Sequence, residues 1–204
     1  RAGQHAGHRF KELAPGDVVT PPVRSLVARW AANGALAGVG AAAVLMWMDK
    51  LQYHALLNLV FVLLPGTAFG LAVSIPLWRR GLAAGWLAAV FVAGSIIAWP
   101  AAYYTGVRVL LAIETPGPLR LALAGLAGGL VWSTILTAAL CVLPFMRVGR
   151  TWLALPIAGG LAGALCASLL ETLGQWGFGA IYIVLWGVWY AVQGGMIATV
   201  LPRD

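Results

Sequence analysis

Residues 172–202 read TLGQWGFGAIYIVLWGVWYAVQGGMIATVLP, a run of 31 residues without Asp, Glu, Lys or Arg. A helix needs about 20 apolar residues to cross the roughly 30 Å hydrocarbon core of a bilayer. A membrane-spanning β-strand would instead show about ten residues of alternating polarity, and this run does not alternate. The stretch therefore predicts a transmembrane helix.

Five further runs lack these charged residues: 30–48, 51–78, 81–107, 121–146 and 151–170. The sequence therefore predicts an all-α integral membrane protein with six transmembrane helices. We expect the spans at 30–48, 55–78, 82–104, 121–146, 151–173 and 178–201. Short polar connections between them predict three antiparallel hairpins.

The composition supports this class of fold. Of the 204 residues, 61% are hydrophobic and only 9% are charged, against about 25% charged in soluble domains. The mean hydropathy is +0.89. A soluble domain of this length could not bury so much apolar surface, and two cysteines cannot form a disulfide scaffold.

Residues 1–29 form an N-terminal arm that precedes the six-helix transmembrane domain, residues 30–204. The arm has no apolar core, so it does not have the pattern of a signal peptide. Because the chain begins with Arg1 rather than Met, we expect either a processed product or a fragment of a longer one.

The distribution of Lys and Arg predicts the orientation, since these residues gather on the cytoplasmic side. With six spans both termini share one side, and that side collects ten of the 13 Lys and Arg residues. We therefore expect both termini in the cytoplasm and a bacterial-type inner (plasma) membrane. The same bias accounts for the net charge of +7 without a nucleic-acid partner.

Two kinds of helix position stand out for packing. Pro65 and Pro100 lie inside expected spans, where each removes a helix hydrogen bond that neighbouring helices can replace. Glycines four residues apart allow helix backbones to approach closely in lipid. We expect such packing among the spans 30–48, 82–104 and 151–173, or against another subunit. The candidate packing positions are Gly34, Gly38, Gly81, Gly85, Gly125, Gly129, Gly159 and Gly163.

Catalytic chemistry is not evident in the sequence. There is no hydrolytic, metal-binding or phosphate-binding motif, and no ionisable residue lies at mid-membrane depth, where ion-coupled transport would need one. We therefore expect no enzyme, no metal and no cofactor.

One candidate ligand site lies toward the outer side. Glu171 is the one acid within a long apolar stretch, and Trp176, Tyr103 and Tyr104 are expected at a similar depth. These residues predict a cavity that opens outward. The alternatives are an interfacial carboxylate and an ordinary aromatic belt that also includes Trp99.

The last span carries a broad polar-aromatic face, whose members are Tyr182, Trp186, Trp189, Tyr190 and Gln193. Their spacing places them along one side of a helix. Such a face can bind a lipid tail or another lipophilic ligand, or it can pack in the core. The connection 105–120 is the longest, and its apolar residues 107–113 predict a short helix along the interface.

Three functions are consistent with these patterns. The favoured one is a non-catalytic accessory subunit of a larger membrane complex, whose partners are the lipid bilayer and other membrane proteins. The alternative is a permease or substrate-binding component for a neutral or lipophilic solute. Six helices in about 200 residues superficially resemble the substrate-binding components of vitamin importers, but no ligand motif supports that analogy. The third is a membrane sensor or anchor.

Overall fold

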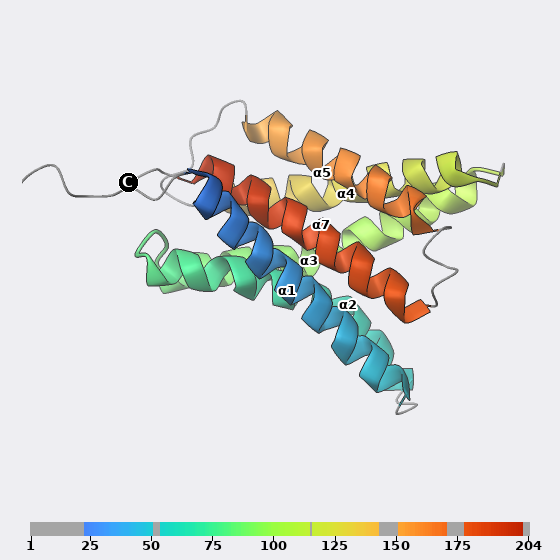
Figure 1. The fold of residues 1–204 in the computed structure, drawn as a ribbon, viewed down its shortest axis with the longest axis horizontal. Coiled ribbons are helices and arrows are strands. Elements are labelled where there is room, and N and C mark those ends of the chain that lie inside the picture. The colour runs from blue at the N-terminus through green and yellow to red at the C-terminus, as the bar shows by residue number, and fades with distance from the viewer. Residues whose placement is uncertain (1–22, 51–53, 115, 143–150, 171–177, 202–204) are drawn as a thin grey trace, which may run out of the picture.

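The fold was analysed in a computed structural model, which describes residues 23–50, 54–114, 116–142, 151–170 and 178–201. These residues form six α-helices, and none of them lies in a strand (Figure 1). The helices are α1 (Val23–Lys50), α2 (His54–Arg79), α3 (Gly85–Ala112), α4 (Pro118–Cys141), α5 (Thr151–Ser168) and α7 (Phe178–Val200). The expected all-α class is confirmed.

Five of these helices, all except α5, are long and apolar enough to cross a membrane. The apolar part of α5, Leu153–Ser168, is shorter than the expected span 151–173, and residues 171–173 lie outside the described part of the chain. The apolar helices identify a multi-pass membrane protein.

Three further helix ends differ from the expected spans by five residues or more. Helix α4 ends at Cys141 rather than at residue 146. Helix α1 begins at Val23 rather than at residue 30, because Pro21 and Pro22 directly precede it and no breaker separates Val23 from the apolar part. Helix α3 continues to Ala112 rather than ending at residue 104, so the expected interfacial helix 107–113 forms its last turns. Its end is held by Arg120, whose Nε donates to the Leu110 carbonyl oxygen at 2.7 Å.

The helices form two closely packed pairs, α1 with α7 and α4 with α5. Helices α2 and α3 connect these pairs, because α2 packs against α1 and α3 while α3 packs against α4. The most extensive pairings are α1 with α7 and α4 with α5, followed by α3–α4, α2–α3 and α1–α2. Helices α1, α3 and α5 hardly touch one another, so the expected packing among the spans 30–48, 82–104 and 151–173 is wrong. The first residues of α1 and the last of α7 lie at the same end of the bundle (Figure 1).

Glycines account for the two most extensive pairings. A Cβ atom on Gly34 or Gly38 of α1 would overlap the backbone of α7 at Tyr190 or Trp186. Between α4 and α5, Gly125 lies against Gly163 and Gly129 against Gly159, again with a backbone carbonyl where a Cβ atom would be. No side chain separates these backbones, which therefore approach closely.

Gly81 and Gly85 do not have the expected packing role. No atom of another helix lies within 4 Å of the position that a Cβ would take on either residue. Gly81 instead follows α2 with a φ of 70°, and the next residue, Leu82, donates its N–H to the Leu77 carbonyl oxygen at 3.0 Å. This is the left-handed glycine that ends many helices. Gly85 is the exposed first residue of α3.

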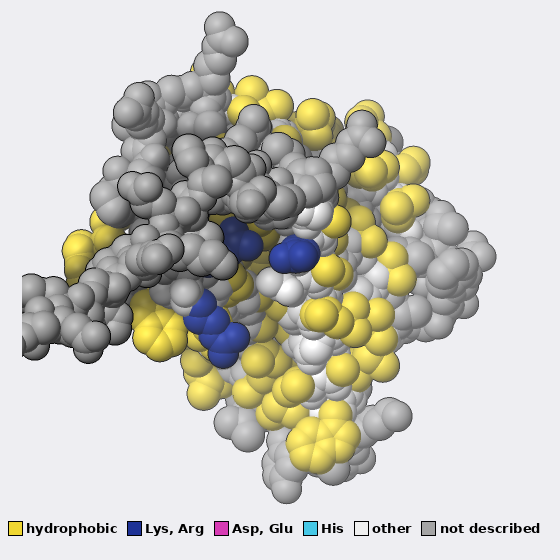
Figure 2. Space-filling model, turned by 60° about the vertical axis from the view of Figure 1, so that its left-hand side comes forward, with side chains coloured by type: hydrophobic (Ala, Val, Ile, Leu, Met, Phe, Trp, Pro, Cys, Tyr) yellow, Lys and Arg dark blue, Asp and Glu magenta, His cyan; other side chains and the backbone are white. Residues whose placement is uncertain are grey.

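Arginine side chains gather at the end of the bundle where α1 begins and α2 meets α3 (Figure 2). They are the exposed Arg29, Arg79 and Arg80. The flanks between the two ends carry mainly hydrophobic side chains, including exposed Leu36, Leu111 and Leu161. A surface of this kind suits contact with lipid tails.

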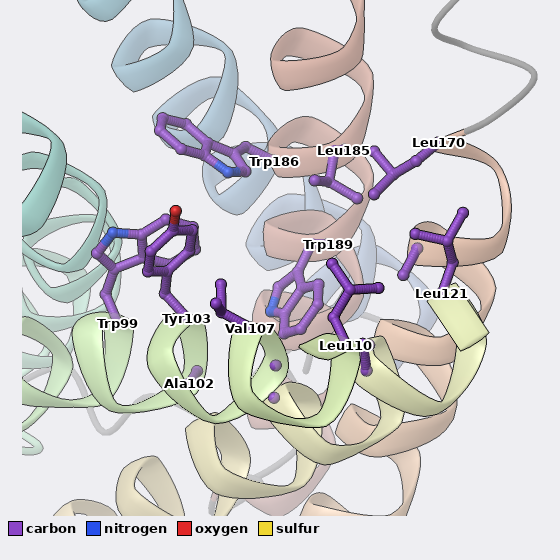
Figure 3. Close-up of a pocket in the computed structure, with 15 residues that line it drawn as sticks. Trp99, Ala102, Tyr103, Val107, Leu110, Leu121, Leu170, Leu185, Trp186 and Trp189 are labelled. Carbon is purple, nitrogen blue, oxygen red and sulfur yellow. The ribbon is translucent and has the colours of Figure 1, made fainter. Parts of the chain in front are cut away.

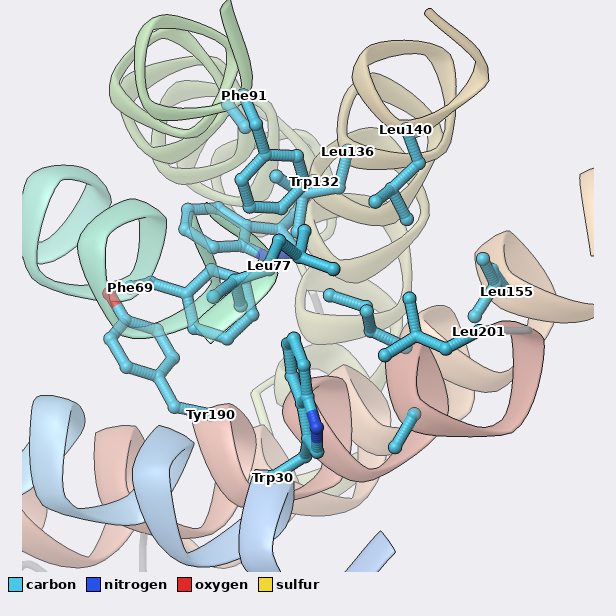
Figure 4. Packing of buried hydrophobic residues seen from close by; sticks show 14 of the residues in the cluster. Trp30, Phe69, Leu77, Phe91, Trp132, Leu136, Leu140, Leu155, Tyr190 and Leu201 are labelled. Carbon is cyan, nitrogen blue, oxygen red and sulfur yellow. The ribbon is translucent and has the colours of Figure 1, made fainter. Parts of the chain in front are cut away.

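The core is aromatic. Phe69, Trp132 and Tyr190 lie together at the centre (Figure 4), and the rings of Trp132 and Tyr190 stack with centroids 5.8 Å apart. Beside them Gln193 of α7 donates to the Ser133 hydroxyl of α4 at 2.9 Å. This buried hydrogen bond ties α7 to α4 where Gly159 of α5 also approaches.

Pro65 leaves the Phe61 carbonyl oxygen without its usual helix donor, because proline has no N–H to reach four residues back. The indole N–H of Trp99, on α3, donates to that oxygen at 2.8 Å. The expected replacement of a lost helix hydrogen bond by a neighbouring helix is thus present at Pro65. It also fixes the orientation of Trp99.

Candidate functional site

A narrow pocket lies between α3 and α4 on one side and α7 on the other, with α5 closing its wall (Figure 3). Its volume is about 190 Å³. Along α3 the lining runs from Trp99 to Leu110, which are eleven residues apart and therefore about 16 Å apart along the helix axis. The pocket is thus long for its volume, which suits a slender ligand.

The pocket exists because small residues line one side of it. Gly106 of α3 lies against Ala124 and Gly128 of α4, and these small residues line the pocket together with Gly125. Large side chains close the remaining sides. Those are Trp99, Tyr103, Val107, Leu110, Leu121, Leu170, Leu185, Trp186 and Trp189.

The aromatic end of the pocket is held rigidly. Trp99 is fixed by its bond to the Phe61 carbonyl oxygen, and its ring meets that of Trp186 edge-on with centroids 5.2 Å apart. Phe61 also packs against Tyr103, at 5.2 Å. These edge-to-face contacts hold the rings of α2, α3 and α7 in one arrangement.

Two hydrogen-bond donors of the wall have no partner. The indole nitrogens of Trp186 and Trp189 are buried, and neither donates to any acceptor. Both rings belong to the wall of the pocket (Figure 3), although other atoms cover their nitrogens. A buried unpaired donor costs about 1–3 kcal/mol, and an acceptor oxygen on a ligand would remove that cost.

A second hollow, of about 420 Å³, adjoins the pocket near the turn between α3 and α4. The two share three lining residues: Leu110, Leu121 and Leu170. Arg120, Pro116 and Gly117 complete the second hollow. Its wall thus adds a charged side chain to otherwise apolar surroundings.

The structure brings together some of the expected site residues. Tyr103, Trp186 and Trp189 line the pocket, and Glu171 and Trp176 lie outside the described residues. Tyr104 is exposed and contacts the ring of Tyr103 at 5.6 Å, so it stands beside the pocket.

Three other expected ligand residues do not line it. Tyr182 packs against Phe61 and Trp186 on the far side of the aromatic cluster. Tyr190 is buried in the core, where its hydroxyl has no hydrogen-bond partner, and Gln193 binds Ser133. The physical reason for Tyr182 and Gln193 is their position along α7: they share the helical face of Trp186 and Trp189 but lie about one turn beyond them at either end. Tyr190 is turned away from that face and stacks on Trp132.

The sequence interpretation missed Gly106, Val107, Leu110 and Arg120, because it placed residues 105–120 in a connection. The signal was available in the facing small residues Gly106 and Gly128. No group of three or more His, Cys, Asp or Glu side chains that could hold a metal occurs among the described residues.

The chain matches no protein-family model, no curated protein and no solved structure.

Proposed function

We propose that this protein is a non-catalytic, multi-pass membrane protein that binds a lipophilic ligand in the pocket between α3, α4, α5 and α7. The observation that carries the proposal is the pairing of an apolar slot with two indole N–H groups, of Trp186 and Trp189, that have no acceptor. Ligand sites of this type combine apolar walls with a few polar groups that orient the ligand.

The shape of the slot selects the type of ligand. Pockets for drug-sized molecules have volumes of about 300–1,000 Å³, whereas this one has about 190 Å³. An acyl chain fits a long, narrow space, and a fused ring system does not. An ester or keto oxygen on that chain would accept hydrogen bonds from the indoles. Because other atoms cover both nitrogens, a hydrogen bond to the ligand needs a small movement of the wall.

Photo-crosslinking tests the proposal. A monoacylglycerol with a diazirine in its acyl chain would be added to the purified protein in nanodiscs, and the modified residues would be mapped by mass spectrometry. We expect saturable labelling of the lining residues. Val107→Trp fills the slot and should abolish it, whereas Val109→Trp, two residues along α3 and outside the lining, is the matched control.

The contribution of the two indole N–H groups to binding can be tested separately by substitution. Trp186→Phe and Trp189→Phe keep the apolar wall and remove one N–H each. We expect each to weaken binding about two- to tenfold, the range of a single net hydrogen bond. Equal labelling of the Val107→Trp and Val109→Trp proteins would show that the probe binds elsewhere and would overturn the proposal.

A second candidate function is an accessory subunit, and one surface feature favours it. A shallow groove of about 440 Å³ runs between α2 and α3 on the outside of the bundle. Its floor includes Gly85, Ala88, Ala89 and Ala93, and small residues of this kind admit the close approach of another helix. Ala89→Trp should release a partner subunit that co-purifies with the protein; retention of the partner would contradict this use of the groove.

A further inference from the structure

We infer that the ligand is an anionic phospholipid, with its acidic head group at Arg120 and one acyl chain in the slot. This inference rests on the proposed function and specifies the chemistry of the ligand. Three independent features of the same region support it: the charge at its mouth, the shared wall of the two hollows and the position of the indole donors.

Among the described residues, no carboxylate pairs with the charge at the mouth, Arg120. Arg120 is partly buried and uses its Nε to hold the Leu110 carbonyl oxygen at 2.7 Å. A guanidinium has further N–H groups that can bind a phosphate. No ion pair joins Arg120 to a carboxylate among the described residues, where Glu114 at this end of the bundle is exposed.

The start of α4 adds to this preference for an anion. The helix begins at Pro118, and its N-cap residue, Gly117, offers no side-chain hydrogen bond. The first N–H groups of a helix without such a cap are available to an acceptor, and the helix dipole favours negative charge there. Gly117 lines the same hollow as Arg120.

The two hollows are adjacent and share part of their walls. Leu110, Leu121 and Leu170 belong to the walls of both, so a molecule with its head group at Arg120 would pass these leucines to enter the slot. A phospholipid has this shape, with a charged end, an apolar end and a narrow link between them.

The link contains the ester oxygens. When the phosphate lies at Arg120, the ester carbonyl enters the slot ahead of the acyl chain, on the side where Trp189 faces Leu110 and Val107 (Figure 3). The ester thus supplies the acceptor that the indole lacks. A fatty acid would place its carboxylate at Arg120 but has no ester carbonyl for the indole N–H groups. A neutral glyceride has the ester carbonyl but no acidic group for Arg120.

The test compares lipids that differ only in the head group. Diazirine-labelled phosphatidylglycerol, phosphatidylcholine, diacylglycerol and free fatty acid with the same chain would be added to nanodiscs of unlabelled phosphatidylcholine. We expect phosphatidylglycerol to label the slot about fivefold more strongly than phosphatidylcholine, the factor that corresponds to roughly 1 kcal/mol per basic residue near a membrane surface.

Variants at two arginines separate a specific site from general surface charge. Arg120→Gln should remove the preference for phosphatidylglycerol and retain labelling of the slot. Arg120→Lys keeps the charge and should retain the preference, even though it changes the bond to the Leu110 carbonyl. Arg108→Gln, at an exposed position of α3 outside both linings, is the control and should leave the preference intact.

The outcomes distinguish the two proposals. Saturable labelling of the slot with no head-group preference would overturn the anionic ligand and leave the proposed function standing. Absence of saturable labelling by every lipid would overturn both. If the free fatty acid competed as well as phosphatidylglycerol, the role of the ester would be wrong and the acidic group alone would define the ligand.

Discussion

Trp99 connects the architecture of the helices to the pocket. Its indole N–H binds the Phe61 carbonyl oxygen that Pro65 leaves without a donor, and its ring lines the slot. A proline in the second helix thereby determines the orientation of a side chain in the third. The site therefore depends on a residue that does not touch a ligand.

This dependence predicts a coupling between Trp99 and Pro65. Trp99→Phe leaves a partly buried carbonyl unsatisfied and should lower the free energy of unfolding by about 1 to 2 kcal/mol, measured by titration with SDS in mixed micelles. Pro65→Ala restores the N–H that reaches Phe61. In that background we expect Trp99→Phe to cost about 1 kcal/mol less, and equal costs in both backgrounds would contradict the role of the bond.

Tyr190 offers the opposite case. Its hydroxyl is buried and has no hydrogen-bond partner, so Tyr190→Phe removes an unsatisfied polar group and keeps the ring that stacks on Trp132. We expect the free energy of unfolding to stay the same or to rise, by up to about 1 kcal/mol. A loss of stability in the same SDS titration would show that the hydroxyl has a partner in the membrane.

At the scale of single residues, the sequence identified the prolines and most of the aromatic wall. It could not identify which donor replaces the bond lost at Pro65, because any polar side chain on a neighbouring helix could do so. It also could not separate Trp186 and Trp189, which face the slot, from Tyr190, which faces the core. That distinction depends on which helices surround α7.

At the scale of elements, the helices are paired through glycines whose partners are backbone carbonyl groups. Gly38 of α1 lies against Trp186 of α7, the residue that also forms the pocket wall. A shift of α1 away from α7 would therefore remove the contact that holds the Trp186 backbone, and with it the Trp186 ring, in place.

Two glycines of the same helix provide a matched test of this pairing. A Cβ at Gly38 would overlap the backbone of α7, whereas a Cβ at Gly40 would meet nothing within 4 Å. Gly38→Ala should destabilise the protein by about 1–3 kcal/mol through overpacking. Gly40→Ala should be neutral or stabilise it by up to about 1 kcal/mol, the difference in helix propensity. Equal effects of the two substitutions on unfolding in SDS would contradict the pairing.

The sequence pattern predicted a packing role for all four pairs of glycines spaced four residues apart. For this reason it was wrong about Gly81 and Gly85. A spacing of four residues marks one helical face, but it does not say whether another helix lies opposite. Gly81 has a turn role that only its positive φ reveals. Likewise, the expected span ends at residue 104, although a helix can carry an arginine near the membrane surface, here Arg108, and continue to Ala112.

At the scale of the whole molecule, the composition was sufficient to predict an all-α membrane protein. Apolar content constrains the class of fold because only helices and closed barrels satisfy their backbone groups in lipid. The partners of each helix were not predictable in this way, since lipid-facing and core-facing residues are equally apolar. The pocket depends on those partners and was only partly foreseen.

The expected orientation can be tested at two positions at opposite ends of the bundle. We predict that Arg80 faces the cytoplasm and Glu114 the outside. Single cysteines at these positions, in a protein whose free Cys141 and Cys166 have been replaced, would be treated with a membrane-impermeant maleimide in intact cells. Labelling at 114 but not at 80 is expected, and the reverse pattern would invert the orientation.

The tryptophans around the slot have a consequence for spectroscopy. Trp99, Trp186 and Trp189 border the space that a ligand would enter, whereas Trp47, Trp78 and Trp86 are exposed on the outer surface. The emission of the outer group reports on the surrounding solvent or lipid, and that of the inner group changes when the slot fills. The protein therefore contains its own fluorescent indicator of occupancy, and binding can be followed by the colour and lifetime of its emission without any attached dye.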